Sequence, residues 1–221
     1  MKYKKLEIEI SDSFELFKYL KESGYIKNSK DPLWWPNSGS FEVVVGAILT
    51  QQTKWQKVEK ALNNIKEKNL LSLESLSKCD TKILSTLIKP SGFYNTKAKR
   101  LKLLANNILR DFGNFKIFQD KVDREWLLEQ KGIGKESCDS ILCYACFRDI
   151  LPVDNYTARV LNKFGYNFEE YDELREWCES GILKNLDKIY KIYGEKKPIY
   201  EIFARFHGKI VEYAKEMRSR E

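Results

Sequence analysis

Apolar positions along this chain recur mostly at the three- and four-residue spacing of helices. The longest stripe runs from Ala98 to Ile108 and stops before Gly113, and the nearly all-apolar stretch 41–49 is long enough for a buried helix. A first helix is expected from a cap at Ser11 or Asp12 to near Gly24. Further helices are expected around 58–65 and at 80–89, 126–128, 154–164, 171–182, 185–193 and 197–217. Another begins after Gly134, where Ile141, Leu142 and Ala145 continue its apolar stripe. Only the alternation over 6–10 favours a short extended start. The pattern therefore predicts an all-α fold.

The net charge of the chain bears on the kind of partner it binds. Among 221 residues, 39 Lys and Arg outnumber 32 Asp and Glu, which gives a net charge of +7 and favours, without requiring, a polyanionic partner. No apolar run approaches membrane-spanning length, and the charged start leads into no signal-peptide core. We therefore expect a soluble protein of the cytoplasm that does not bind membranes. We also expect it to be a monomer.

The cysteines do not suggest a disulfide framework. They stand at the odd number of five positions, 79, 138, 143, 146 and 178. Cys143-x-x-Cys146 has a spacing that metal sites use, but it lies in an apolar helical stretch and no second pair follows. We therefore expect small buried thiols and no metal site.

A hairpin between two helical stretches offers the first candidate chemistry. In Gly132-Ile133-Gly134, glycine permits a sharp turn, after which the amides and the next helix can face an anion such as a DNA phosphate. Lys135 follows, and its side chain is expected to contact a phosphate or to face solvent. A plain helical connection is the alternative reading, because a Gly-x-Gly turn alone is weakly specific.

Taken together with other segments, this hairpin resembles the helix-hairpin-helix superfamily of DNA base-excision glycosylases. The resemblance spans roughly 34–213 in the family's order. It is carried by the hairpin and by the segments 49–53, 91–101, 153–160 and 206–209. Within the superfamily, Trp-Trp-Pro-Asn at 34–37 and the neighbourhood of Lys209 most resemble bacterial 3-methyladenine DNA glycosylase III.

The resemblance implies an all-α, two-lobed fold with the active-site cleft between the lobes. A helical barrel lobe would cover 36–150, and the second lobe would join 1–35 to 151–221. Double-stranded DNA is the implied partner. In such families the turn's carbonyls often hold a monovalent cation, which could help to neutralise a phosphate.

The implied catalytic residue is Asp154. A carboxylate beside the sugar stabilises the positive charge that develops as an N-glycosidic bond breaks, and it can orient or deprotonate water. The alternative is that Asp154, after Pro152, only caps the following helix, although both roles can coexist.

Two departures from relatives narrow the predicted chemistry. Bifunctional members have a nucleophilic lysine two residues after the second glycine, where this chain has Glu136, so we expect no lyase activity. Many relatives carry an iron-sulfur cluster near the C-terminus, but no cysteine follows Cys178. We therefore expect no cluster and no required cofactor.

A base pocket is implied around the tryptophans. Trp34, Trp35, Pro36 and Trp55 provide flat apolar surfaces that could sandwich a flipped purine. Alkylated adenine is electron-poor and cationic as the nucleoside, so it stacks well on tryptophan. Packing in the core or between lobes is the alternative role for these side chains.

Three further positions have open assignments. Gln52 aligns with the residue that relatives insert into the gap left by the flipped base, and Gln51 could serve instead. Lys209 is implied near the base pocket, where a neutral, paired or carbamylated side chain suits a cationic base better than an ammonium group. An ordinary pair with Glu212 is the alternative, and His207 is expected to be structural.

These observations predict a monofunctional glycosylase for alkylated purines, chiefly 3-methyladenine, that leaves an abasic site. A related enzyme could remove another lesion or a mismatched base with the same Asp154. The remaining alternative is a non-catalytic helix-hairpin-helix protein that only binds DNA.

Overall fold

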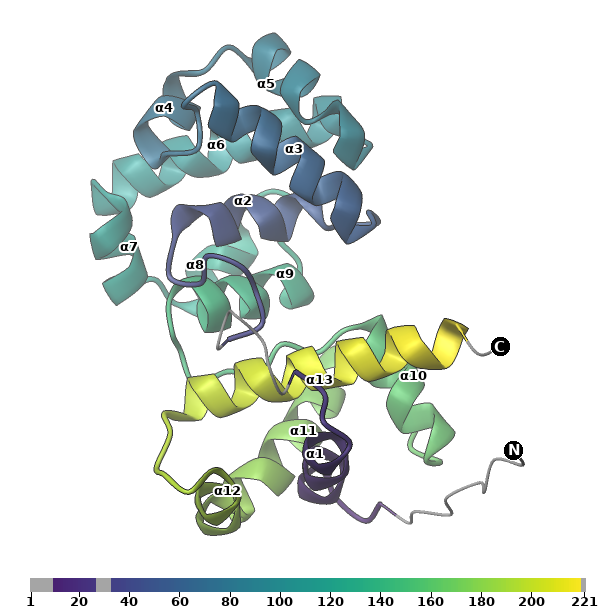
Figure 1. Cartoon of the computed structure of the whole chain (residues 1–221). Helices are drawn as coiled ribbons and strands as arrows, with labels where there is room; N and C mark the ends of the chain where they lie inside the picture. Colours follow the sequence, from purple (N-terminus) through teal and green to yellow (C-terminus); the bar gives the residue numbers. More distant parts are fainter. Residues whose placement is uncertain (1–9, 27–32, 220–221) are drawn as a thin grey trace. The chain divides into compact units, whose positions relative to one another are not determined.

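The computed structural model describes residues 10–26 and 33–219, where the regular elements are all helices (Figure 1). The all-α prediction is therefore confirmed. The chain forms two compact units, one of residues 35–150 and one that joins 1–34 to 151–221. The predicted extended start lies outside the described residues, except for Ile10.

The unit of residues 35–150 is built around one buried helix. This helix, α2 (Phe41–Leu49), is apolar on all sides, and every residue except Glu42 is buried, as a helix surrounded by others requires. Helices α3, α6 and α9 pack against it. The other helices of this unit are α3 (Trp55–Glu67), α4 (Leu73–Lys78), α5 (Thr81–Leu87), the 3-10 turn Lys89–Ser91, α6 (Tyr94–Phe112), α7 (Phe115–Lys121), α8 (Arg124–Glu129) and α9 (Lys135–Ser140).

Side-chain caps begin several of these short helices. Asp80, Asn114 and Asp123 each accept a hydrogen bond from a backbone amide in the first turn of the helix that follows. Helices α4 and α7 were not predicted, because six and seven residues contain too few apolar positions to show a period.

One predicted helix is wrong in its geometry. The apolar stripe predicted a helix that continues through Ala145, but α9 stops at Ser140 and residues Ile141–Ala145 form a π-helical turn. The amide of Cys146 donates to the backbone oxygen of Ile141, five residues earlier. Gln119 supports the end of this turn by donating to the backbone oxygen of Ala145.

The cysteines are buried thiols, and none forms a disulfide. Burial raises the pKa of Cys146 to about 12, so this side chain stays protonated at neutral pH. Within the described ranges 10–26 and 33–219, no cluster of three His, Cys, Asp or Glu side chains could hold a metal ion.

The second unit is organised along its last helix. Its helices are α1 (Ser13–Glu22), α10 (Asn155–Lys163), α11 (Tyr171–Lys184), α12 (Leu186–Tyr193) and α13 (Ile199–Ser219). Helix α13 packs against α1 and α10 (Figure 1), and its Phe203, Phe206 and Ile210 enter the core. In the part of the chain that the structure describes, no helix has both the length and the apolar composition needed to cross a bilayer.

Candidate active site and nucleic-acid interface

Asp154 is the N-cap of α10. Its Oδ1 accepts from the amide of Thr157 at 2.8 Å and from the Thr157 hydroxyl at 3.1 Å. The amide of Asp154 in turn donates to that hydroxyl, which completes a capping box. The capping role foreseen from the sequence is thus present, and it uses one carboxylate oxygen.

The other oxygen, Oδ2, lies 3.4 Å from Nε2 of His207 on α13. The two side chains are only 14% and 6% exposed. Burial raises the pKa of Asp154, but the bonds from His207 and Thr157 more than offset it and leave the pKa below its ordinary value. Asp154 is therefore an ionised carboxylate at neutral pH.

His207 was predicted to be structural, and the structure places it beside Asp154. It stands 53 residues from Asp154 on another helix, so no local spacing connects the two. The useful signal is that it is the chain's single histidine and lies one turn from Phe203 and Ile210 on an apolar helix, a place where a polar side chain needs a buried partner.

Trp34 completes a cluster with these two residues. Its ring meets His207 edge to face at 5.3 Å, and its Nε1 donates to Glu212 at 3.1 Å. Gly208 makes this packing possible, because a Cβ at that position would overlap the Trp34 ring. Asp154, His207 and Trp34 thus form one connected group, called here the Asp154 cluster.

Lys209 is fully buried, with 1% of its surface exposed. Its Nζ donates to the backbone oxygen of Tyr25 at 2.6 Å. The alternative pair with Glu212 is not formed, because Glu212 accepts from Trp34 and Lys215 instead. Burial lowers the pKa of Lys209 to about 7, with a smaller contribution from nearby cationic side chains.

The other predicted pocket residues, apart from Lys209, belong to the unit of residues 35–150. Trp35 is 7% exposed and packs in this unit, with Tyr144 at 5.3 Å and Trp55 at 5.9 Å between ring centres. Gly46 of α2 also lies against the Trp35 ring. These contacts give Trp35 a packing role, whereas Pro36 is exposed.

The predicted hairpin is formed by α8, the turn that follows and α9. Gly132 has φ +88°, whereas Gly134 has φ −98°, so only the first glycine needs the left-handed region. Ile133 is buried between them. Arg124 of α8 binds the fully buried Asp139 of α9, with Nε and Oδ1 2.8 Å apart. This ion pair holds the two helices of the hairpin together.

The two glutamines before α3 differ in their surroundings. The Gln51 amide donates to the backbone oxygen of Gly132 at 2.8 Å and to the Ser137 hydroxyl at 3.0 Å. Gln52 is exposed and adopts φ +53°. Gln51 is therefore anchored to the hairpin, and Gln52 presents its side chain to solvent.

Lys135 and Glu136 occupy the first turn of α9. Lys135 is partly exposed and Glu136 is exposed. Successive helix residues differ in direction by about 100°, so the amine of Lys135 cannot simply replace a lysine at position 136.

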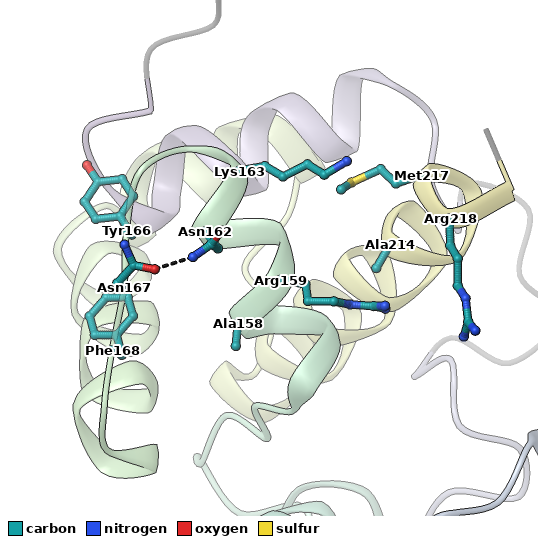
Figure 2. A pocket seen from close by; sticks show the side chains of 10 residues that line it. All are labelled: Ala158, Arg159, Asn162, Lys163, Tyr166, Asn167, Phe168, Ala214, Met217 and Arg218. Carbon is teal, nitrogen blue, oxygen red and sulfur yellow. Dashed lines mark hydrogen bonds between the residues drawn. The ribbon is translucent and has the colours of Figure 1, made fainter. Parts of the chain in front are cut away.

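A separate pocket of about 440 Å³ lies between α10, the segment after it and α13 (Figure 2). Arg159, Lys163 and Arg218 contribute to its lining, together with Phe168 and Met217. None of its lining residues belongs to the predicted site or to the Asp154 cluster. This pocket is therefore distinct from the Asp154 cluster.

The fold and these contacts define an all-helical protein with a helix-hairpin-helix motif and a capped, ionised aspartate. Residues 45–182 match the family described as HhH-GPD superfamily base excision DNA repair protein. The chain belongs to this superfamily of DNA glycosylases.

Individual relatives agree with this assignment. A Methanocaldococcus jannaschii protein with a provisional name as a DNA repair glycosylase is 40% identical over 191 residues, which cover 83% of this chain and 80% of that protein. The crystal structure of H. pylori 3-methyladenine DNA glycosylase (MagIII) bound to 1,N6-ethenoadenine is 45% identical. It superimposes with a TM-score of 0.90 and covers 93% of this chain and 98% of that one.

A more distant structure shares the fold alone. The trapped endonuclease III–DNA covalent intermediate is 17% identical, with a TM-score of 0.65. The alignment covers 92% of this chain and 86% of that chain.

The two hairpin glycines provide a matched test of backbone strain. A Cβ at Gly132 would be strained at positive φ and would overlap the Arg100 side chain, whereas a Cβ at Gly134 meets nothing within 4 Å. We expect Gly132→Ala to lower the free energy of unfolding by about 1–3 kcal/mol, chiefly through the positive φ because the end of the Arg100 side chain can shift, and Gly134→Ala by at most about 1 kcal/mol. Urea unfolding of both variants measures the difference, and equal losses would contradict this account of the turn.

The buried Lys209 makes a prediction about pH. Its pKa is about 7 when folded and near the ordinary lysine value of 10.5 when unfolded, so the unfolded chain binds more protons between these values. The free energy of unfolding should therefore rise with pH over this window, by on the order of 1–3 kcal/mol from this group.

Lys209→Met, which keeps a long apolar stem and cannot titrate, should remove that contribution. Chemical unfolding of both proteins at several pH values between about 7 and 10 measures it. The same slope in the variant and the wild type would show that Lys209 does not carry the pH dependence.

Proposed function

We propose that this protein is a monofunctional DNA glycosylase that removes alkylated purines, chiefly 3-methyladenine, from double-stranded DNA. In this proposal it acts as a monomer in the cytoplasm and leaves an abasic site. The observation that carries the proposal is the Asp154 cluster, in which one carboxylate oxygen caps α10 and the other faces His207 beside Trp34. The similarity to H. pylori 3-methyladenine DNA glycosylase supports the substrate class.

Asp154 can assist hydrolysis without a second carboxylate. As the N-glycosidic bond breaks, its electron pair goes to the base and positive charge develops on the sugar, which an ionised carboxylate stabilises. The water oxygen then bonds to the sugar carbon, and its proton passes to Asp154 or to solvent. The depressed pKa of Asp154 keeps the carboxylate in the form that both steps need.

Alkylated adenine suits this limited set of groups. Its positive charge weakens the glycosidic bond, so the departing base leaves neutral and needs little help from an acid. In the cluster, the partly exposed Trp34 offers an electron-rich ring on which a cationic purine can stack. We assign base recognition to Trp34, with His207 as the partner that holds Asp154 in place.

DNA binding in this proposal uses the hairpin and the loop before α3. The hairpin amides and Lys135 contact a phosphate, where a monovalent cation held by turn carbonyls could assist. Gln52 enters the gap left by the flipped base, because Gln51 is already bonded to Gly132 and Ser137. Gln52 is exposed and long enough to reach a base stack.

In this proposal Lys209 aids binding of a cationic base because its side chain is largely uncharged. Since its pKa is about 7, a substantial fraction of this side chain is a neutral amine at physiological pH. A neutral amine does not repel a cationic base, and it can add to carbon dioxide with loss of a proton to form a carbamate. We propose that Lys209 is neutral or carbamylated in the active protein.

The proposal makes a prediction for Asp154→Asn. Asparagine keeps an oxygen that can cap α10, so the fold and DNA affinity should be nearly unchanged. Loss of the negative charge should slow excision by at least about 100-fold, as removal of one strong electrostatic contact does. Chromatography of bases released from a methylated duplex measures this, with circular dichroism and duplex binding as controls.

The outcomes separate the candidate functions. Release of 3-methyladenine by the wild type, and not by Asp154→Asn, supports the proposal. Release of a different damaged or mismatched base would instead support a glycosylase of other specificity. Tight duplex binding without release of any base would support a non-catalytic DNA-binding protein.

A further prediction of the proposal concerns lyase chemistry. With Glu136 in place of the nucleophilic lysine, no Schiff base should form with the sugar. Borohydride added during excision should therefore trap no covalent protein–DNA complex, while the abasic product is cleaved only by later alkali. A lysine-dependent glycosylase assayed in parallel provides the positive control. A trapped band with this protein would contradict monofunctional chemistry.

A further inference from the structure

Lys97 of α6 is a buried side chain with an unusual number of partners. It is 2% exposed, and its Nζ lies 2.9 Å from each of four oxygen atoms. These are the backbone oxygens of Leu49, Gln51 and Ser91 and the hydroxyl of Thr53. An ammonium has three protons, so this group is surrounded by at least as many acceptors as it can use.

The four oxygen atoms come from two segments that end helices. Leu49 is the last residue of α2, and the chain then turns through Gln51 and Thr53 into α3. Ser91 ends the 3-10 turn before α6. Carbonyl groups at helix ends lack partners within the helix. Lys97 supplies partners to both segments and so ties them together.

Thr53 strengthens the same connection. Its hydroxyl donates to the backbone oxygen of Ser91 at 2.5 Å and lies 3.1 Å from that of Gln51. Burial lowers the pKa of Lys97 to about 8, and Arg100 adds a smaller effect. The surrounding oxygens favour the charged form of Lys97. The charged group therefore holds this loop through its hydrogen bonds.

Gln52 stands between two of these anchored residues. Its φ of +53° is a left-handed conformation that costs an ordinary residue about 1–2 kcal/mol. Among the described residues, no hydrogen bond of its side chain holds this conformation. The loop is held instead on either side of Gln52, at the backbone oxygen of Gln51 and the side-chain hydroxyl of Thr53, both bonded to Lys97.

We propose that Lys97 is a positioning residue for DNA insertion, which fixes the left-handed backbone of Gln52 so that its side chain is presented before DNA arrives. This inference rests on the proposed function only in assigning insertion to Gln52. Without Lys97, the buried oxygens would lose their donor and the loop would relax. Insertion would then require ordering the loop at the moment of binding, which weakens it.

The test compares two lysines of one helix. Lys97→Met removes the ammonium and keeps a long side chain. Lys102→Met is the matched control, because Lys102 is also on α6 and donates to one backbone oxygen, that of Cys79, away from this loop. Thr53→Val is a second variant, which removes the hydroxyl at nearly constant volume in case Lys97→Met does not fold.

The first measurement needs no DNA. The amides of Thr50 and Thr53 are hydrogen-bonded in the turn, so their exchange with solvent reports its opening. Lys97→Met, or Thr53→Val, should speed their exchange by about tenfold or more, while Lys102→Met should leave it unchanged. Unchanged exchange in a folded Lys97 variant, or in Thr53→Val if that variant is the one that folds, would overturn the proposal.

The second measurement uses a duplex with a stable abasic-site analogue and 2-aminopurine opposite it. Gln52→Ala and Lys97→Met should each weaken binding by about tenfold and change the 2-aminopurine fluorescence alike, with affinity for undamaged duplex retained. The double variant should then be little weaker than either single variant. Fully additive losses would show that Lys97 does not act through Gln52 and would overturn the proposal.

The two measurements also separate this inference from the proposed function. If the wild type releases no base but the exchange result holds, the glycosylase proposal fails and the loop-anchoring part of the inference stands. If Gln52→Ala binds the abasic duplex as the wild type does, insertion by Gln52 is wrong, and with it the positioning role of Lys97. If the wild type excises bases normally but amide exchange is unchanged in the Lys97 variant, only the Lys97 inference is overturned.

Discussion

Unpaired backbone groups at helix ends are the constraint on which this structure depends. Short helices leave many amides and carbonyls without partners inside the helix, and burial makes each unmet group costly. This chain meets the need with side chains: Asp154 caps α10, Gln51 binds the hairpin carbonyl of Gly132, and Lys97 binds the end of α2. One of these side chains, Asp154, is also the candidate catalytic carboxylate.

Asp154 shows how one such residue can have two uses. The capping bonds occupy Oδ1 and orient the carboxylate, while Oδ2 faces His207 in a nearly closed environment. A carboxylate held in this way needs little reorganisation when positive charge develops beside it. The cap and the proposed catalytic role therefore support each other, because the same hydrogen bonds that begin the helix keep the group ionised.

Much of the fold could be predicted from the sequence, since long apolar stripes and Asp or Asn caps act locally. The buried helix over 41–49, the helix closed by Gly113 and a start of α1 at Ser11 or Asp12 follow such rules and were predicted, and the structure shows Asp12 as the cap. The failures have physical reasons. Helices α4 and α7 are too short to show a period, and the π-helical turn at Ile141–Ala145 has the same apolar composition as an α-helix.

The sequence by itself determined the class of fold, the superfamily and the position of the candidate carboxylate, because apolar periodicity and the order of motifs are properties of the sequence that need no knowledge of packing. Tertiary structure alone decided the partners: His207 beside Asp154, Tyr25 in place of Glu212 for Lys209, and an anchored Gln51 beside an exposed Gln52. These contacts join residues 53, 184 and 81 positions apart in the chain. Such pairs depend on how whole helices pack, which local sequence patterns do not specify.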